Sequence, residues 1–491
     1  MMSSTTDPIA FRLPRNVEYH DKPGSIILVR DFPLKSIRLH KIWEPLFNIL
    51  SSGHFIPLDQ LKDQCLSINP DQLEIFFYDL VRKGFLEQRG NPEIRNHPFV
   101  SIIIPVRNRP DEIKACLESL LVLDYPSDKL EIIVVDDAST DHTPSIVKQF
   151  NVRLIQLETN QKAPYCRNLA AGKAKGDILA FIDSDCIADK GWLSHLVQAF
   201  LDPKVGIVGG RVDGFFKTSR LDRYEQVNSS LIIGTHIKRS GDANKFFYVP
   251  SCNLLVKKDL FLTLGGFNPK LAVGEDVDLC WRIQNAGSEV EFRPNGTVFH
   301  RHRNKLAPFC QRRFDYGTSE PLLQKLHPDR KKQFYFPAGG LLFWCLIFLS
   351  FYISPDLIFF CPAVILADSL VKYIKTARQK LPVRFFQHLK AVVRSDAVLF
   401  YHCASFVSRY YLIFALLISP VFPKTALFLI SLHLFSGSVD FIIKKPRLSI
   451  VDFLFFYTLE QISYQAGVWA GALHHFSFGP IAPSITFQIT H

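Results

Sequence analysis

Two aspartates that follow a short apolar run are the first residues in this chain that indicate chemistry. Ile178–Ile182 has the length and composition of a buried strand, and Asp183-Ser184-Asp185 comes directly after it. Side chains two positions apart in a strand point to the same side of the backbone. Two neighbouring carboxylates repel each other unless they share a cation, and hard oxygen ligands suit Mg²⁺ or Mn²⁺ on a diphosphate. The alternative is a solvated turn after a strand.

A second acidic group lies further along the chain, in Gly274–Asp278 (GEDVD), where it opens a helix predicted over Leu279–Asn285. The helix dipole alone favours acidic residues in a first turn. A carboxylate here can also act as a general base, if it lies within about 2.6–3.2 Å of the hydroxyl that it deprotonates. His300 and His302 follow in a strand-like stretch, Gly296–Arg303, which places both on one face.

These residues need a scaffold, and residues 98–336 predict one. Apolar runs that predict strands alternate with helical patterns; the strands are Val100–Val106, Leu130–Val135, Val152–Leu157 and Ile178–Ile182, and the helices are Glu112–Leu121, Ser145–Phe150 and Ala163–Ala174. This alternation predicts an α/β fold with a doubly wound parallel sheet, whose ligand crevice lies at the carboxyl ends of the strands. No dinucleotide-binding or P-loop glycine motif is present, which argues against an NAD Rossmann domain and a P-loop NTPase.

Four motifs recur at the predicted strand ends in a fixed order: SIIIPVRNRP, IIVVDDASTD, RNLAAGKAKGDILAFIDSD and GEDVDLCWRIQNAG. This order resembles the family 2 glycosyltransferases, which have the GT-A fold, over about residues 99–320. The resemblance implies a metal-dependent, inverting glycosyltransferase. Such an enzyme moves a hexose from a nucleotide sugar, here a UDP-sugar, to an acceptor hydroxyl with Mn²⁺ or Mg²⁺ as cofactor.

The same resemblance implies residue roles. The residues implied to bind the nucleotide sugar are Pro105, Val106, Arg107, Asp136, Asp137, Arg167, Asp183 and Ser184. Those implied to hold the metal are Asp183, Asp185 and His300. Asp276 is the implied general base, with Glu275 and Asp278 as alternates.

Two stretches depart from the family pattern. Members often have glycine before the Arg-Asn pair, whereas residues 160–164 are Asn-Gln-Lys-Ala-Pro, which predicts a different loop there. Gln311–Phe314 partly resembles the Q-x-x-R-W motif of processive synthases, but the aromatic residue and its spacing differ, so polymerisation is not inferred. Arg312 and Arg313 are predicted either to contact phosphate or to form a solvated face.

The first 97 residues predict a small separate module. Residues 1–24 are predicted to be a loose arm, and residues 25–97 a winged-helix-like domain; its predicted strand is Ser25–Arg30 and its predicted helices are Leu34–Leu50, Pro57–Cys65 and Pro70–Gly84. By pattern it resembles the PqqD-like peptide-recognition domains of peptide-modifying enzymes. A cap that packs on the next domain is the alternative. No helix carries a dense Lys/Arg face, so nucleic acid is not an expected partner.

Residues 337–491 predict a hydrophobic, membrane-associated region. The apolar stretches are Ala338–Ile353, Leu357–Ala367, Ala397–Ser419, Thr425–Ile443 and Ile450–Trp469. The basic segment Lys372–Arg394 is expected on the cytosolic side of the cytoplasmic membrane together with the catalytic domain. Residues 338–367 would then enter the membrane and return, as a hairpin or a re-entrant pair bent at Pro355. An anionic leaflet also accounts for the net charge of +11. A wholly soluble chain would need a very large Phe-rich core.

Charged residues within these stretches, Arg409, Asp440 and Glu460, argue against simple lipid-facing helices. The ten cysteines show no C-x-x-C pair, which favours reduced thiols over a disulfide scaffold or a zinc site. The whole arrangement of module, transferase and hydrophobic tail resembles the glycosyltransferases of the mycofactocin system. That resemblance implies a peptide-derived redox cofactor as acceptor. The alternatives are a transferase of cell-surface polysaccharide or glycolipid, which would take a carbohydrate or lipid acceptor, and a non-catalytic membrane scaffold.

Overall fold

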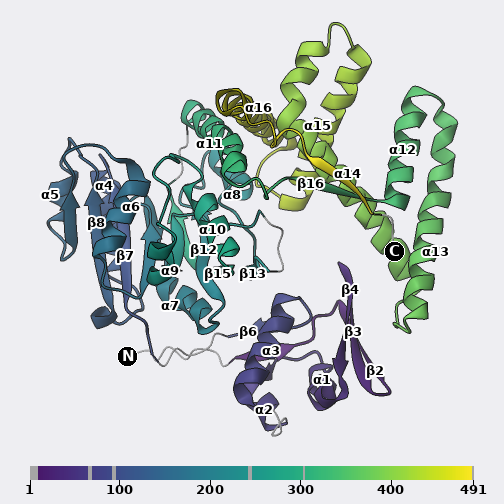
Figure 1. Cartoon of the computed structure of the whole chain (residues 1–491), viewed down its shortest axis with the longest axis horizontal. Coiled ribbons are helices and arrows are strands. Elements are labelled where there is room, and N and C mark those ends of the chain that lie inside the picture. Colours follow the sequence, from purple (N-terminus) through teal and green to yellow (C-terminus); the bar gives the residue numbers. More distant parts are fainter. Residues whose placement is uncertain (1–8, 65–68, 91–95, 242–245, 302–304, 489–491) are drawn as a thin grey trace. The chain divides into compact units, whose positions relative to one another are not determined.

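The computed structural model describes residues 9–64, 69–90, 96–241, 246–301 and 305–488 (Figure 1). The chain divides into two compact units. One unit comprises residues 1–93, 332–403 and 483–491, and the other comprises residues 94–331 and 404–482. The second unit contains all the motifs identified above.

A nine-stranded sheet forms the centre of the second unit, in the order β11-β15-β12-β14-β10-β7-β8-β9, with β13 paired to β15. Its strands are β7 (Val100–Val106), β8 (Leu130–Asp136), β9 (Arg153–Gln156), β10 (Ile178–Ile182), β11 (Cys186–Ala188), β12 (Val205–Gly214), β13 (Lys238–Arg239), β14 (Asn253–Lys257) and β15 (Glu289–His300). The four strands predicted first, β7 to β10, are parallel as expected.

Beyond these four strands, whose parallel arrangement is as predicted, the sheet is mixed. β14 runs antiparallel to both of its neighbours, β10 and β12, and β11 and β13 run antiparallel to β15. A strand covered by helices on both faces is apolar whichever way it runs, so its composition does not reveal its direction.

Helices cover both faces of this sheet (Figure 1). They are α4 (Pro110–Leu120), α5 (Thr143–Val147), α6 (Lys162–Lys173), α7 (Trp192–Leu196), α8 (Arg220–Asn228), α9 (Lys258–Thr263), α10 (Glu275–Asn285) and α11 (Leu306–Leu326). Ile102 and Ile104 of β7 enter one core with α4 and α7, while Ile103 enters a second core with α6, α9 and α10. The period-two alternation of the strand therefore builds the two helical layers.

The second unit also contains the helices α15 (Pro423–Lys444) and α16 (Ile450–His475), and α14 (Phe385–Ile418) from residue 404 onward. α16 packs closely along α11. Gly317 of α11 and Gly467 and Gly471 of α16 permit this close approach, since a Cβ at any of them would overlap backbone atoms of the facing helix. α16 also buries Glu460 and Gln465. The apolar stretch Ile450–Trp469 is thus a helix that packs on the transferase part.

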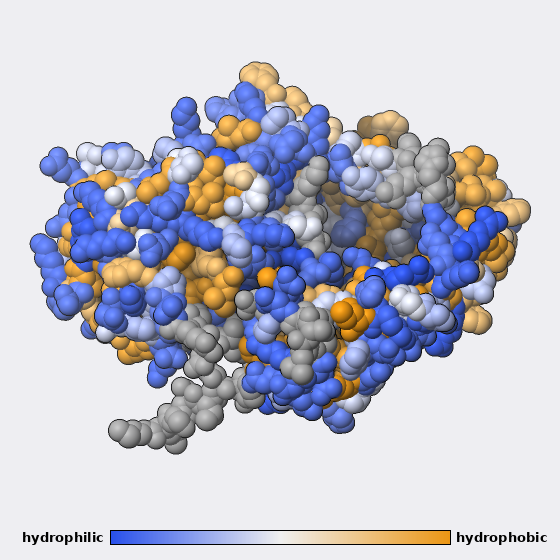
Figure 2. Space-filling view, turned by 60° about the horizontal axis from the view of Figure 1, so that its bottom comes forward, coloured by the Kyte–Doolittle hydropathy of each residue, from blue (hydrophilic) through white to orange (hydrophobic). Residues whose placement is uncertain are grey.

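Within the described part of the chain, three helical stretches are long and apolar enough to cross a membrane: residues 355–378, 385–418 and 423–444. The first belongs to a helical hairpin of α12 (Ala338–Tyr352) and α13 (Cys361–Arg378), which turns at residues 353–360 as the sequence predicts around Pro355 (Figure 1). Phe348, Phe359 and Leu370 of this hairpin are exposed. Apolar side chains lie along the right-hand edge of the surface in Figure 2, where the hairpin is found.

The N-terminal part of the first unit contains two small sheets, β5-β1-β6 and β2-β3-β4, and three helices. Its elements are β1 (Ala10–Arg12), β2 (Val17–Lys22), β3 (Ser25–Asp31), β4 (Leu34–His40), α1 (Glu44–Leu50), β5 (Ile56–Pro57), α2 (Leu58–Asp63), α3 (Pro70–Arg82) and β6 (Glu87–Arg89). β16 (Gln333–Pro337) and β17 (Ser484–Gln488) pair in parallel within the same unit.

Two predictions for this part are wrong. The loose arm of residues 1–24 contains β1 and β2 in its described part, and Phe11 is fully buried in the core with Phe47 and Phe77. The helix predicted over Leu34–Leu50 begins only at Glu44, after the strand β4. Ile37 and Leu39 alternate with polar neighbours, and this strand period outweighs helix propensity.

Candidate active site

Arg167 joins the two acidic motifs of the chain. This arginine lies on α6 and is almost fully buried. Its Nη2 donates to Asp183 Oδ1 at 2.5 Å, and its Nη1 donates to Glu275 Oε1 at 2.9 Å. Burial raises the pKa of Asp183, but the positive charge and hydrogen bond of Arg167, together with the charges of His300 and Arg109, outweigh burial and hold that pKa below its ordinary value. The end of β10 and the start of α10 therefore meet at Arg167, although they are far apart in the sequence.

Asp276 follows Glu275 at the start of α10. Its two carboxylate oxygens accept hydrogen bonds from the backbone N–H groups of Ser251, at 3.2 Å, and Val277, at 2.8 Å. Burial, and then the neighbouring charge of Glu275, raise the pKa of Asp276 to about 7. A carboxylate with a pKa near neutrality can both accept and release a proton at physiological pH, which is the property of a general base.

Asp278, the alternate base, lies in a different environment. It is buried and accepts hydrogen bonds from Arg282 at 2.7 Å and from the ring of His327 at 2.8 Å. Burial raises the pKa of Asp278, but these two hydrogen bonds outweigh burial and lower it. Asp278 therefore holds α10 in place and is not a candidate base.

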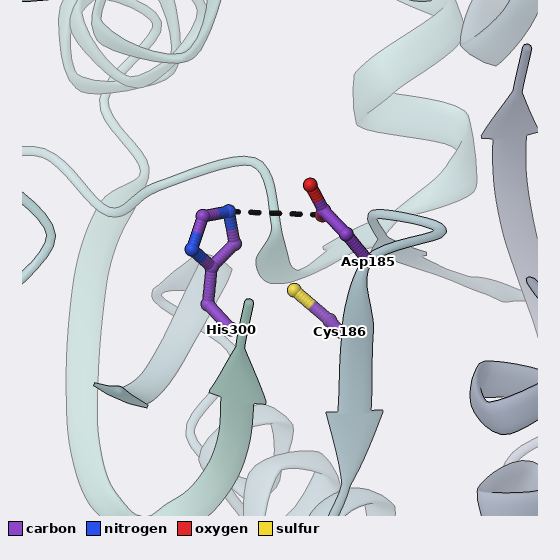
Figure 3. Close-up of side chains that lie close together, drawn as sticks. All are labelled: Asp185, Cys186 and His300. Atoms are coloured by element: carbon purple, nitrogen blue, oxygen red, sulfur yellow. Dashed lines mark ion pairs between the residues drawn. The ribbon is translucent and has the colours of Figure 1, made fainter. Parts of the chain in front are cut away.

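Asp185 lies at the second position of the D-x-D motif and faces His300 at the end of β15 (Figure 3). His300 Nε2 is 3.6 Å from Asp185 Oδ1, which is buried and has no hydrogen-bond partner among the described residues. The other carboxylate oxygen of Asp185 forms an ion pair with Arg109. Arg109 was missed by the sequence reasoning; its position in the RNRP turn after β7 was the available signal.

These donor atoms fit a divalent cation. Ligand atoms of Asp185, Cys186 and His300 lie within 4.8 Å of one another. Burial, and then a hydrogen bond with Cys252, raise the pKa of the Cys186 thiol well above its ordinary value, so Cys186 is a poor ligand for Mn²⁺ or Mg²⁺. The open oxygen of Asp185 and the imidazole of His300 are the suitable donors. Asp183 does not belong to this group of ligand atoms, and its Oδ1 pairs with Arg167 at 2.5 Å. His302 lies outside the described residues.

Asp136 and Asp137 end β8, and the structure separates their environments. Asp137 accepts hydrogen bonds from the backbone N–H groups of Gln161, at 2.6 Å, and Lys162, at 2.9 Å, and so fixes the start of α6. Asp136 is buried and has one oxygen, Oδ1, without a hydrogen-bond partner among the described residues. Asp136 is thus the better candidate for a nucleotide contact.

The loop before α6 has a backbone that favours glycine. Lys162 has a φ of 71°, a left-handed conformation that glycine adopts without strain. Asp137 holds Lys162 in this conformation through the backbone hydrogen bond. The replacement of the family's glycine therefore does not by itself remove the left-handed turn.

The loop after β7 lies beside the end of β8. Pro105 and Val106 are buried within β7, whereas Arg107 is exposed. Asn108 donates its backbone N–H to Ser139 Oγ at 2.9 Å and so ties this loop to the loop after β8. Ser184 is buried between the two aspartates of the D-x-D motif.

The two arginines of α11 have different environments. Arg312 is exposed, stacks 4.7 Å above the Tyr316 ring, and interacts electrostatically with Asp183 and Glu275. Its positive charge is therefore available at the acidic crevice. Arg313 fits neither of its predicted roles, because it is buried and paired with Glu225 at 2.5 Å.

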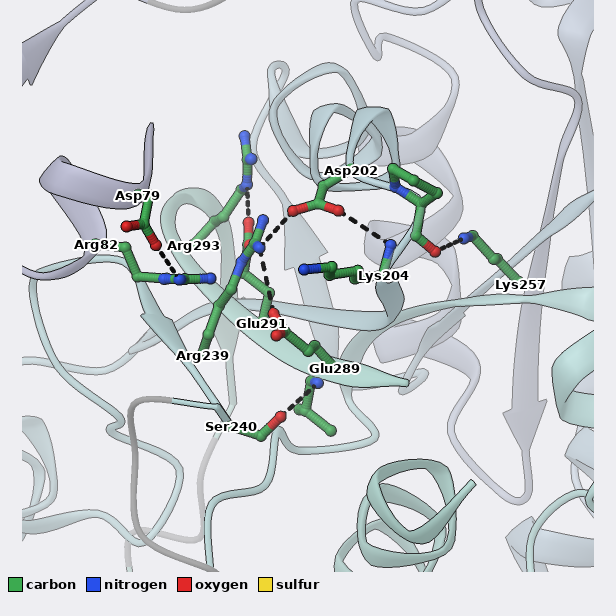
Figure 4. Close-up of polar contacts among 12 residues, drawn as sticks. Asp79, Arg82, Asp202, Lys204, Arg239, Ser240, Lys257, Glu289, Glu291 and Arg293 are labelled. Atoms are coloured by element: carbon green, nitrogen blue, oxygen red, sulfur yellow. Dashed lines mark hydrogen bonds and ion pairs between the residues drawn. The ribbon is translucent and has the colours of Figure 1, made fainter. Parts of the chain in front are cut away.

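An ion cluster centred on the buried Arg239 ties β13 to β15 (Figure 4). Arg239 of β13 pairs with Glu291 of β15, with Glu289 at 3.2 Å and with Asp202 at 2.6 Å. Arg293 adds a second positive charge, at 2.5 Å from Glu291.

Comparison with known proteins identifies the domain that carries these residues. Residues 101–262 match the family model described as glycosyl transferase family 2. The chain contains a family 2 glycosyltransferase domain. The matched segment includes Arg109, Arg167 and the D-x-D motif, and the transferase fold continues through α10 and β15.

Relatives extend the likeness beyond the glycosyltransferase domain. The pre-mycofactocin glycosyltransferase of Mycobacterium tuberculosis is 26% identical over 405 residues, which are 80% of this chain and 84% of that protein. Glycosyltransferase AglE of Haloferax volcanii is 32% identical over 202 residues, 40% of this chain and 64% of that protein. These matches show that the chain is a glycosyltransferase.

Among solved structures, the mannosyltransferase PcManGT from Pyrobaculum calidifontis, in complex with GDP-Man and Mn²⁺, is also similar. The match covers 62% of this chain and 89% of the mannosyltransferase chain, with 19% sequence identity and a TM-score of 0.40. A likeness at this level adds no argument to the sequence relatives.

Proposed function

We propose that this glycosyltransferase transfers a hexose from a UDP-sugar to a hydroxyl of a peptide-derived acceptor with inversion at the anomeric carbon. The observation that carries the proposal is the Arg167 bridge, which joins Asp183 of the D-x-D motif to Glu275 beside Asp276. The groups for the leaving phosphates and the group for the attacking hydroxyl are thereby supplied by one crevice.

Arginines offset the acidic side chains on the donor side of the crevice. Arg109, Arg167 and Arg312 bring positive charge to the D-x-D motif, where a nucleoside diphosphate needs it. Asp185 and His300 would hold Mn²⁺ or Mg²⁺, and the bound cation would neutralise charge on the departing diphosphate. Pro105, Val106 and Asp136 are the candidates for contacts with the base and ribose.

The acceptor side requires a base, and Asp276 is the candidate. The acceptor hydroxyl would give its proton to the Asp276 carboxylate while its oxygen attacks the anomeric carbon. The bond from that carbon to the diphosphate oxygen would break on the opposite face, and UDP would leave with the bonding electrons. The pKa of about 7 supports this role, because the carboxylate is largely charged at slightly alkaline pH.

The acceptor named for one of these relatives is pre-mycofactocin. The match to the Mycobacterium tuberculosis protein named for this substrate covers 84% of that protein and 80% of this chain. The match is therefore longer than the transferase domain. The N-terminal module of residues 25–97 would then serve peptide recognition. The three candidate spans support membrane association, and the basic Lys372–Arg394 segment favours a cytosolic catalytic domain.

The direct test is mass spectrometry of pre-mycofactocin incubated with the purified chain and UDP-glucose, with Mn²⁺ or with EDTA. A mass increase of one or more hexoses that requires the metal is the expected result. Turnover in EDTA equal to that in Mn²⁺ would contradict the metal dependence. Transfer to a lipid phosphate or polysaccharide acceptor, with none to pre-mycofactocin, would contradict the acceptor.

A further inference from the structure

The hairpin of α12 and α13 exposes apolar side chains along most of its length. Phe359, at its turn, is 77% exposed, and exposed apolar residues continue along α13 through Val371 to Ile374. A soluble monomer rarely exposes so continuous an apolar surface, whereas a bilayer covers it. The exposed side chains then become basic, at Lys375 and Arg378. Basic residues at the end of an apolar helix extend to the lipid headgroups, so these two residues mark the base of the hairpin.

The base of the hairpin belongs to a segment with a large excess of positive charge. Residues 372–394 contain seven lysines and arginines and no aspartate or glutamate. The seven are Lys372, Lys375, Arg378, Lys380, Arg384, Lys390 and Arg394. Two of them have acidic partners outside the segment, since Lys372 pairs with Asp368 at 2.7 Å and Arg384 with Glu18 at 3.1 Å. The remaining excess of positive charge complements an anionic leaflet.

One face of the N-terminal module packs on this segment. Alternate residues of β3 point to opposite faces of the sheet β2-β3-β4. Ile26 and Leu28 enter the core of the module, whereas Ile27 and Val29 form a second, smaller core with Val383. Val383 lies between α13 and α14, so the module and the hairpin share a packed interface within the first unit.

The turn between β3 and β4 lies against the first part of α14. Gln387 of α14 donates from its side chain to Asp31 at 2.6 Å. About two helical turns further along α14, the guanidinium of Arg394 lies 4.8 Å from the centre of the Phe32 ring. Phe32 is nonetheless 58% exposed. The module therefore presents an aromatic ring to solvent beside a basic residue of α14.

The same part of α14 exposes apolar and basic side chains of its own. The spacing of Phe386, Lys390 and Val393 places them on one face of the helix. Phe386 is 70% exposed and Val393 is 46% exposed, and Lys390 is exposed as well. Asp396 of α14 interacts electrostatically with Lys372 of α13, so this part of α14 lies beside the base of the hairpin.

The chemistry of these residues distinguishes between possible partners. Exposed aromatic and apolar side chains among lysines and arginines fit an anionic bilayer, which takes up both kinds of group. Nucleic acid would pair with the positive charges but leave Phe32 and Phe386 in water. Continuity with the hairpin favours lipid over a soluble protein, because the bilayer that covers Ile374 also reaches the residues beside it.

We propose that Phe32, Phe386, Lys390, Val393 and Arg394, here termed the hairpin-base surface, bind the headgroups of anionic phospholipids and hold the N-terminal module at the bilayer. The proposal goes beyond glycosyl transfer and does not depend on it. It makes the module and the hairpin one membrane-bound unit.

The experiment uses the full-length chain in nanodiscs of phosphatidylcholine and phosphatidylglycerol, with the photo-crosslinker p-benzoylphenylalanine in place of Phe32. Matched chains carry the crosslinker at Phe359, in the turn of the hairpin, or at Ile75, which is 66% exposed on α3. Mass spectrometry after irradiation should find lipid adducts at positions 32 and 359, at least fivefold above those at position 75. Adducts at position 32 that are no more frequent than at position 75 would overturn the proposal.

The same nanodiscs test the charge of the headgroup. Phosphatidylglycerol should make up at least twice the share of adducts at position 32 that it has in the bilayer. The double change Lys390→Glu with Arg394→Glu should lower this share to the bilayer value. A matched double change of two exposed lysines in the transferase part, Lys129→Glu with Lys148→Glu, should leave it unchanged. A share equal to the bilayer value without any charge change would overturn the preference for anionic lipid, and that result does not depend on the folding of the charge variants.

A peptide is the competing occupant of this face of the module. Pre-mycofactocin added before irradiation should leave the lipid adducts at position 32 within twofold of their level without it. Peptide adducts at position 32 that replace the lipid adducts would overturn the proposal and assign the face to the acceptor. None of these measurements uses hexose transfer, so a failure of the proposed function would not change their outcome.

Discussion

Replacement of Asp276 by asparagine is expected to raise the stability of this chain at pH 8 and to lower its transfer activity. The pKa of Asp276 rises from 3.8 to about 7 on folding, so between these values the folded chain binds more protons than the unfolded chain. The free energy of unfolding therefore falls as the pH rises through this window. A difference of three pKa units corresponds to about 4 kcal/mol, which the folded wild type loses by pH 8.

In the Asp276→Asn variant the side chain at this position does not titrate, so the free energy of unfolding does not fall as the pH rises through this window. Its amide has one acceptor oxygen where the carboxylate has two, so one backbone hydrogen bond, to Ser251 or Val277, is lost at a cost of about 1 kcal/mol. Asp276→Asn should thus be more stable than the wild type at pH 8, by up to about 3 kcal/mol, and slightly less stable at pH 4. Sugar transfer should fall by about 100-fold or more because the base is absent.

Two assays check these expectations. Unfolding midpoints of both proteins in one detergent, from pH 4 to pH 8, should cross as the pH rises. The transfer rate of the wild type at saturating substrates should rise about tenfold per pH unit below 7 and level off above it. A wild-type rate that is flat between pH 5.5 and pH 8, or transfer by Asp276→Asn at the wild-type rate, would refute the assignment of the base.

Three further changes test other parts of the structure. Asp185→Asn should weaken Mn²⁺ binding about tenfold or more, measured by electron paramagnetic resonance of free Mn²⁺ in the presence of UDP; unchanged binding would exclude Asp185 as a ligand. Gly467→Ala should destabilise the chain by about 1–3 kcal/mol, because the added Cβ overlaps the backbone of α11. The matched control Gly172→Ala, whose Cβ meets no atom within 4 Å, should leave the unfolding midpoint unchanged or raise it, and equal losses in both would contradict the helix packing. Lys162→Gly should raise the free energy of unfolding by about 1 kcal/mol by relieving the left-handed backbone. A lower free energy of unfolding would mean that the Lys162 side chain stabilises the fold by more than the strain costs.

The central part of the fold was predictable from local pattern. The apolar runs at β7 and β10 match the predicted strands residue for residue, because a strand buried on both faces leaves a continuous signal in the sequence. The polar groups that follow these strands meet at one edge, as parallel strand ends must. The direction of β14 was not predictable, because composition does not record how a strand runs.

The candidate site was predictable where a motif is local and unpredictable where partners come from distant elements. The D-x-D motif and the Glu-Asp pair are visible in the sequence, and the structure brings them together through Arg167. Arg313 could not be assigned, because its partners, Glu225 and Glu460, lie on other helices. The catalytic roles of the D-x-D motif and of the Glu-Asp pair remain predictions, which the experiments above test.

The most direct test of the central claim is an anomalous difference map, at the manganese absorption edge, of the chain bound to UDP and Mn²⁺. The account predicts one strong peak between Asp185 and His300, with the diphosphate on the side of Arg109 and Arg167. A peak away from Asp185, or a diphosphate bound apart from the crevice that Arg167 bridges, would contradict the proposed catalytic centre.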